Sequence, residues 1–313
     1  MKYQKTLAVL AGLTFAGALS QAQIAIGENL TISGFVDASY VSEDNSSAGT
    51  DHDEIAVDEV EIDFKFSYDN LSAEVHLQST DALMGSDLIE VEQAFISTGI
   101  GSITVSAGRM LNLLGFESDE ATGLYQASNA YESNTLDDAT RSYNEGIRGS
   151  YSQGDFAISA SITDDLQGTT VGLGDADEVA LDVLLSYNGI ENLAIALGYS
   201  DEGDGDEEVV NLYATYLFGQ FTIAGEYIDV DNTATAGDQD QYLILLNYTI
   251  NDDLSVTGRY SEIDSNTKTE NLEKSTVALN YSISDNLTTV IEYSSADVGA
   301  GATKASEDLL ELQ

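Results

Sequence analysis

Residues 241–260 alternate between apolar and polar side chains with a period of two. One parity carries the apolar residues Tyr242, Ile244, Leu246, Tyr248 and Ile250, and then Leu254, Val256, Gly258 and Tyr260. This spacing predicts two strands, and the break at residues 251–253 predicts the turn of a hairpin. The other parity is mostly polar, with Leu243 and Leu245 as exceptions. Each half is about as long as a tilted strand that crosses a bilayer, so the apolar face meets either a soluble core or lipid.

The same alternation recurs along the chain and predicts sixteen strands. They are expected near residues 29–41, 56–68, 71–78, 86–98, 102–112, 143–152, 155–164, 177–188, 192–201, 207–218, 220–230, 240–250, 254–264, 273–284, 286–296 and from Glu307 onward. An even count suits an antiparallel membrane barrel with both termini on one side.

The expected connections fall into two classes that alternate along the chain. Short turns are expected at residues 69–70, 99–101, 153–154, 189–191, 219, 251–253 and 285. Long polar loops, many of them acidic, are expected at residues 42–55, 79–85, 113–142, 165–176, 202–206, 231–239, 265–272 and 297–306. Short periplasmic turns and long external loops are typical of outer-membrane barrels, so the predicted fold class is an all-β transmembrane antiparallel barrel.

Tyrosines mark both ends of the predicted strands. One row lies before the short turns: Tyr68, Tyr151, Tyr187, Tyr216 with Phe218, Tyr248 and Tyr281. A second row lies near the opposite strand ends: Tyr40, Tyr199, Tyr227, Tyr260 and Tyr293. Two such rows indicate interfacial girdles, although the high strand propensity of tyrosine is the alternative explanation.

The composition excludes several function classes. The 313 residues include 55 acidic and 10 basic side chains, giving a formal net charge of −45, and the chain has no Cys and two His. Without cysteine the chain forms no disulfides and no thiolate metal sites, and two histidines leave few residues for histidine-based catalysis. We therefore expect no enzyme and no cofactor. Nucleic acid is excluded as a partner, because no basic patch is available to bind phosphate.

The N-terminus has the pattern of a secretory signal peptide. Lys2 and Lys5 precede an apolar run, which ends in a small-x-small pattern at residues 20–22. We therefore expect residues 1–22 to be removed and residues 23–313 to form a single barrel domain. No later apolar stretch is long enough to predict a transmembrane helix.

Five segments carry a resemblance to a known family. They are G-F-V-D-A-S-Y at residues 34–40, D-E-V-E-I-D-F at 58–64, E-V-E-Q-A-F-I at 90–96, A-G-R-M-L-N-L-L-G-F-E at 107–117 and L-Y-Q-A-S at 124–128. These segments resemble the β-barrel porins of Gram-negative bacterial outer membranes. The resemblance implies a water-filled channel for small hydrophilic solutes, in contact with outer-membrane lipid. The chain departs from the family at its end, which lacks a terminal aromatic residue, so the last strand is expected to be cut short.

The loop at residues 112–141 is the longest predicted connection. By resemblance to porins it would fold inward and narrow the channel; the alternative is an ordinary external loop. Its candidate constriction residues are Phe116, Glu117, Asp119, Glu120, Glu132, Asp137 and Asp138. Its candidate anchors to the wall are Leu113, Leu114, Phe116, Leu124 and Tyr125.

Strand parity predicts the charged residues of the inner wall. The candidates are Asp37, Glu61, Asp63, Lys65, Glu74, His76, Arg148, Asp182, Glu226, Arg259, Lys274 and Glu292. Because acids outnumber bases here, the lumen is expected to favour cations. Arg109 shares the parity of apolar neighbours and is expected either at the outer rim or at a bulge.

The acidic loops offer one candidate metal site, formed by Asp201, Asp204 and Asp206. Carboxylates suit calcium, but the spacing differs from an EF-hand, so solvated loops that bind divalent ions loosely are the main interpretation. No catalytic residues are predicted.

Three hypotheses follow. The first is a porin that passes small hydrophilic solutes and leans toward cations, with a homotrimer left open. The second is a structural or adhesive barrel with a plugged lumen and ion-binding loops. The third is a soluble secreted β-protein whose apolar face points inward.

Overall fold

The computed structural model describes residues 23–45, 50–80, 89–117, 121–131, 142–164, 179–202, 207–232, 238–266, 271–299 and 305–313. The signal peptide predicted at residues 1–22 lies outside this part of the chain. Within the described ranges no helix has the length and apolar character needed to cross a membrane.

Seventeen strands and one short 3-10 turn, η2 (Ala121–Gly123), make up the described structure. The strands are β1 (Ile24–Ile26), β2 (Leu30–Asn45), β3 (Thr50–Tyr68), β4 (Leu71–Thr80), β5 (Glu90–Ile100), β6 (Ile103–Leu111), β7 (Tyr143–Gln153), β8 (Phe156–Thr163), β9 (Ala180–Ile190), β10 (Leu193–Asp201), β11 (Glu207–Phe218), β12 (Phe221–Asn232), β13 (Gln239–Asn251), β14 (Leu254–Ser265), β15 (Leu272–Ser284), β16 (Leu287–Val298) and β17 (Ala305–Leu312).

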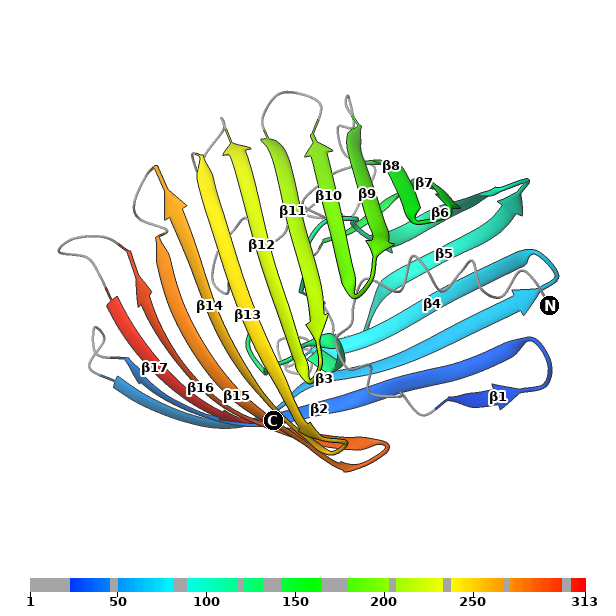
Figure 1. Ribbon diagram of the computed structural model, residues 1–313. Coiled ribbons are helices and arrows are strands. Elements are labelled where there is room, and N and C mark those ends of the chain that lie inside the picture. Colours follow the sequence, from blue (N-terminus) through cyan, green and yellow to red (C-terminus); the bar gives the residue numbers. More distant parts are fainter. Residues whose placement is uncertain are drawn as a thin grey trace.

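Strands β2 to β17 form a closed antiparallel barrel of sixteen strands (Figure 1). Each strand pairs with its sequence neighbour, and β17 closes the ring by pairing with β2, with Leu312 opposite Tyr40. The short strand β1 was not predicted; it pairs antiparallel with the beginning of β2, with Ile24 opposite Ile32. Closure removes the free strand edges that an open sheet of this size would expose.

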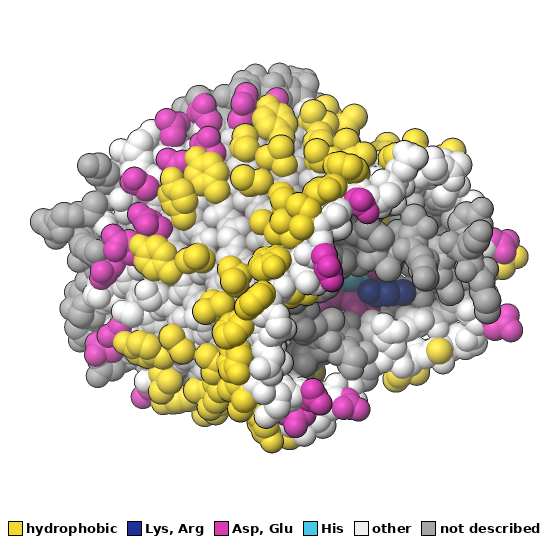
Figure 2. All heavy atoms as spheres, in the orientation of Figure 1, with side chains coloured by type: hydrophobic (Ala, Val, Ile, Leu, Met, Phe, Trp, Pro, Cys, Tyr) yellow, Lys and Arg dark blue, Asp and Glu magenta, His cyan; other side chains and the backbone are white. Residues whose placement is uncertain are grey.

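The apolar face of the barrel points outward. In β13, Ile244 is 59% exposed and Leu246 is 47% exposed, whereas Leu243 and Leu245 on the other face are buried. Figure 2 shows hydrophobic side chains spread over the outer surface, with acidic side chains gathered toward its edge. The soluble interpretation, which needs this face inward, is therefore wrong.

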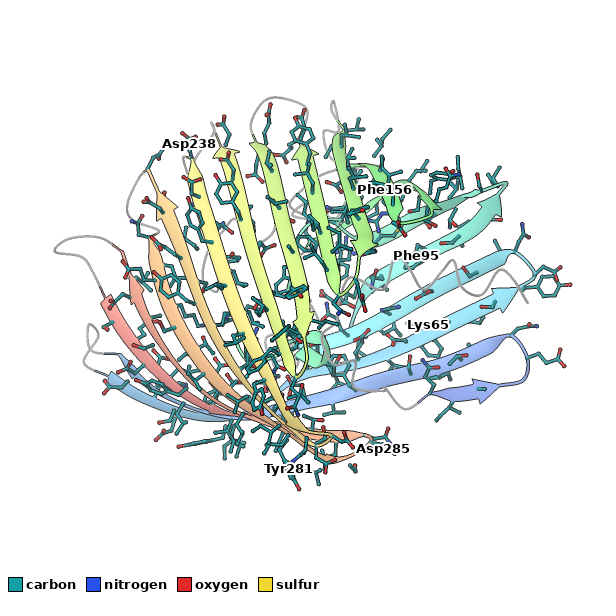
Figure 3. The ribbon with its side chains drawn as sticks, in the orientation of Figure 1. Lys65, Phe95, Phe156, Asp238, Tyr281 and Asp285 are labelled. Atoms are coloured by element: carbon teal, nitrogen blue, oxygen red, sulfur yellow. The ribbon has the colours of Figure 1, made fainter. Side chains whose placement is uncertain are left out.

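The two classes of connection lie at opposite ends of the barrel. Figure 3 shows Tyr281 and Asp285 at the end of the short turns, and Asp238 at the opposite end. The predicted short turns agree with the structure to within one or two residues. Aromatic pairs also occur across strands, such as Phe221 with Tyr248, whose ring centroids are 4.7 Å apart.

The predicted loop at residues 42–55 is wrong over most of its length. Strand β2 continues to Asn45 and β3 begins at Thr50, so only residues 46–49 separate the two strands. The polar composition of this segment hid the extension, because cross-strand polar pairs hold it; for example, the Tyr40 hydroxyl donates to Asp53 Oδ1 at 3.1 Å.

Candidate functional site: the inner wall and the loop inside the barrel

The segment that follows β6 enters the barrel. The Gly115 backbone N–H donates to Asn211 Oδ1 at 3.1 Å, and the Phe116 N–H donates to Glu226 Oε1 at 2.7 Å. The Phe116 ring lies 6.2 Å from the ring of Tyr213, centroid to centroid. Because Asn211, Tyr213 and Glu226 all lie on the inner face of β11 and β12, this segment rests on the inner wall.

An apolar patch on the inner wall explains where the loop docks. We call it the inner apolar patch; it comprises Leu184, Ala196, Val209, Tyr213, Ala224, Ile228, Val230, Leu243, Leu245, Ile263 and Leu272. Leu114, Phe116, Ala130 and Tyr131 of the loop are buried against it, and Leu113 and Tyr125 pack at its border. The exceptions to alternation at Leu243 and Leu245 are thus the loop's contact surface.

Arg259 holds the second half of the loop. It is 3% exposed on the inner face of β14, and its guanidinium donates to Glu117 Oε1 at 2.8 Å and to the Ser128 carbonyl oxygen at 2.8 Å. The same guanidinium donates to the Asn129 carbonyl oxygen at 3.0 Å and to Thr276 Oγ1 at 3.2 Å. Hydrogen bonding that involves a charged group in this way is stronger than bonding between neutral groups.

Glu292 of β16 binds the loop next to Arg259. Its carboxylate accepts the backbone N–H of Ala127 at 2.8 Å, the N–H of Ser128 at 3.1 Å and a short hydrogen bond from the Ser128 hydroxyl. Lys274 donates to the Asn129 carbonyl oxygen at 3.0 Å, and Asn280 donates to the Tyr125 carbonyl oxygen at 2.6 Å.

Four of the predicted wall charges therefore contact the loop. Glu226, Arg259, Lys274 and Glu292 all lie on the inner face, as parity predicted, and each is buried. Arg259 forms an ion pair with Glu117 of the loop, and the other three charged side chains bond to neutral loop groups.

The opposite wall carries a second charged group, on β3 and β4. His76 Nδ1 lies 3.1 Å from Glu61 Oε1 and 3.2 Å from Asp63 Oδ1, and His76 Nε2 lies 3.3 Å from Glu74 Oε2. Lys65 Nζ lies 3.5 Å from Glu74 Oε2. The pairing register places all five on the inner face, and Figure 3 labels Lys65 there.

The remaining predicted wall residues have other hydrogen-bond partners. Arg148 on β7 donates to Ser161 Oγ at 3.0 Å, and the hydroxyl of Ser200 donates to buried Asp182 on β9. Asp37 accepts a hydrogen bond from Gln313 Nε2 at 2.6 Å.

Two sequence candidates lie on the outer face. Arg109 lies 3.2 Å from Glu145 Oε1 and donates to the Glu92 carbonyl oxygen, which fits the rim position that its parity allowed. Asp201 lies two residues after Tyr199, and the Tyr199 hydroxyl donates to Asp201 Oδ2 at 3.2 Å.

Several candidates lie outside the described residues. They are Asp119, Glu120, Glu132, Asp137 and Asp138 of the loop, and Asp204 and Asp206 of the proposed calcium site.

Sequence reasoning missed Gln126, Ser128 and Asn211, which hold the loop. Gln126 donates to Glu117 Oε1 at 2.7 Å, and the partners of Ser128 and Asn211 lie 96 to 164 residues away in the chain. Asn211 is one of many polar residues on inner strand faces, which are common in such barrels. Gln126 and Ser128 belong to the segment at residues 124–128 that resembles porins, but the resemblance gave neither residue a role in holding the loop.

Comparison with known proteins agrees with the geometry. Residues 6–301 match the family model of the Gram-negative porins. The anion-selective porin from Comamonas acidovorans superposes with a TM-score of 0.71 at 14% identity, covering 90% of this chain and 98% of that chain. OmpT of Vibrio cholerae gives a TM-score of 0.59 at 12% identity, covering 92% of this chain and 98% of that chain.

A substituted porin of Rh. blastica gives a TM-score of 0.58 at 17% identity, covering 90% of this chain and 99% of that chain. No curated protein matches the chain. At these identities the solved structures show a shared fold, whereas the family match extends over most of the sequence. The chain belongs to the Gram-negative porin family and is an outer-membrane β-barrel protein.

Proposed function

We propose that the protein is a passive channel for small hydrophilic solutes, with no chemical step. The observation that carries this proposal is the loop inside the barrel. Its described residues contact the inner face of strands between β9 and β16, which supports a passage along the wall formed by β2–β8. Phe116 and Glu117 on the loop, with its further predicted constriction residues, would then bound the narrowest part.

The charges beside this passage favour cations. Lys65 and Glu74 keep 38% and 30% of their side-chain surface exposed, and the acidic residues Asp37, Glu61 and Asp63 lie on the same wall. A ring of acids attracts cations and repels anions. The Comamonas acidovorans porin is described as anion-selective, so the shared fold does not by itself support a cation preference.

Planar-bilayer recording tests both parts of the proposal. Refolded protein is expected to open stable channels. Under a salt gradient, the sign of the reversal potential is expected to show that cations permeate more readily than anions. Closed barrels that bind cells or surfaces in a calcium-dependent manner would favour the adhesive alternative. An anion-type reversal potential would contradict the cation preference and leave the channel intact.

Lys65 and Glu74 provide a matched pair for this measurement. Lys65→Ala is expected to increase the cation preference, because Glu74 loses its cationic neighbour 3.5 Å away. Glu74→Gln is expected to lower the preference, because it removes an accessible negative charge. If the reversal potential moved in the same direction in both variants, Lys65 and Glu74 would not be the residues that set the charge selectivity.

We also propose that the chain works as a homotrimer surrounded by outer-membrane lipid. OmpT of Vibrio cholerae has been solved in a trimer form. The exposed apolar outer face offers a surface for both subunits and lipid. Sedimentation in detergent is expected to give three chains per particle, and a monomer that stays monomeric on addition of lipid would contradict this.

A further inference from the structure

We propose that Glu61, Asp63 and His76 form a binding site for a divalent transition-metal ion, of which Zn²⁺ is the model case, on the inner wall of the barrel. The three side chains offer two carboxylate oxygens and one imidazole nitrogen, and these atoms all lie within 4.8 Å of one another. Histidine nitrogen and carboxylate oxygen are usual zinc ligands.

The distances between the donor atoms fit a coordination shell. Bonds of about 2.0–2.2 Å from zinc place neighbouring ligand atoms about 3.0–3.5 Å apart in tetrahedral or octahedral geometry. His76 Nδ1 lies 3.1 Å from Glu61 Oε1 and 3.2 Å from Asp63 Oδ1. An ion would thus replace close contacts between donors without a large movement of the wall.

Neighbouring groups orient the three donors. His76 Nε2 lies 3.3 Å from Glu74 Oε2, so the tautomer with its proton on Nε2 would donate to Glu74 and direct the Nδ1 lone pair at the two carboxylates. Glu74 is itself held by Lys65. The Ser33 hydroxyl donates to Asp63 Oδ2 at 2.8 Å and turns Oδ1 toward the site. A histidine that binds a metal usually donates its other N–H to a carboxylate in this way.

A buried oxygen at the site fits a cation as its partner. Asp63 is 2% exposed, and the group facing its Oδ1 is His76 Nδ1 at 3.2 Å, which can donate to this oxygen only when Nδ1 carries a proton. The same His76 Nδ1 also faces the Gln93 amide nitrogen at 3.3 Å. A proton on Nδ1 would face this amide donor, and an unprotonated Nδ1 would direct its lone pair at two anions. A divalent ion bound between Nδ1 and the carboxylates would remove the repulsion between the lone pair and the two anions. The ion would also give the buried Asp63 Oδ1 a partner.

The site can be reached from the lumen. Figure 2 shows a hollow in which cationic, acidic and histidine side chains are visible together. Lys65 and Glu74 border the three donors and remain partly exposed. The two ligand carboxylates supply the two negative charges that neutralise a divalent ion.

Calorimetric titration of the refolded full chain in detergent with ZnCl₂ tests the proposal. One saturable ion per chain is expected, and Co²⁺ in its place is expected to give a visible absorption band typical of nitrogen and oxygen ligands. His76→Asn and Asp63→Asn should each lower the affinity for Zn²⁺ at least about 10–100-fold. His52→Asn is the matched control, because this histidine is 62% exposed beside Glu54 and lies nine residues before Glu61 on the same strand, about 30 Å away along an extended chain.

A further variant covers the case in which the ligand variants fold poorly. Glu74→Gln keeps all three ligands and removes only the orienting carboxylate, so it should lower the affinity about 10–100-fold while the circular dichroism of the barrel stays unchanged. No saturable binding to the wild-type chain, or full affinity in folded His76→Asn, would overturn the proposal. Because binding is measured without any current, its failure leaves the proposed channel untouched.

Discussion

At the scale of the residue, Arg259 makes four hydrogen bonds to the loop within the described part of the chain. Its buried guanidinium bonds to the carboxylate of Glu117, to two loop carbonyl oxygens and to Thr276. Removing one member of a buried ion pair leaves the other charge without compensation and costs about 3–5 kcal/mol. Here that cost falls mainly on loop docking, because the barrel's own strand pairing remains.

Arg259→Ala is therefore expected to loosen the loop while the barrel still folds. Single channels should become larger and noisier, since the loop would spend part of its time away from the wall. Arg259→Lys keeps the charge but loses the fork of donors, so its effect should be smaller. Bilayer recording measures both variants, and wild-type conductance in Arg259→Ala would show that other contacts hold the loop.

At the scale of the element, two glycines let neighbouring strands approach. Gly34 in β2 and Gly108 in β6 have φ of 151° and 135°, and a Cβ at either would lie 2.2 Å from a backbone oxygen of the next strand. Such a contact forces the backbone to move, because only glycine fits it. Both residues belong to the segments that resemble porins, which gives those segments a physical role in strand pairing.

Gly108→Ala is expected to lower the yield of folded barrel and the temperature at which it unfolds. Gly149→Ala on β7 is the matched control, because a Cβ there meets nothing within 4 Å. Heating followed by electrophoresis without prior denaturation separates folded from unfolded barrel. Equal unfolding temperatures for the two variants would contradict the steric argument.

At the scale of the whole molecule, the formal net charge of −45 is expected to give the protein a negative electrostatic potential. The range of this potential depends on salt, since the Debye length is about 10 Å at 0.1 M and about 3 Å at 1 M. If the channel prefers cations as proposed, distant acidic groups would therefore add to cation attraction only in dilute salt.

The ratio of cation to anion permeability is accordingly expected to fall when symmetric salt is raised from 0.1 M to 1 M. Reversal potentials measured at a fixed salt gradient around each concentration give this ratio. A ratio independent of salt would assign selectivity to contacts inside the constriction alone.

Local alternation by itself determined much of this protein. Period-two spacing depends only on neighbouring residues, so it predicted the sixteen barrel strands, the short turns and the inward parity of residues such as Glu61 and Arg259. The alternation did not predict the ends of β2 and β3 that extend beyond the apolar outer surface. In these ends polar residues occupy both faces, so no alternating pattern marks the strand.

Only the tertiary structure decided what the inner charges contact. Glu292 meets Ser128 across 164 residues, and Phe116 meets Glu226 across 110, and such pairs follow from barrel closure rather than from local pattern. Parity gives the face of a side chain but neither its depth nor its partner across the lumen. Sequence thus determined which face of the wall each side chain occupies, whereas closure of the barrel decided which charges bind the loop.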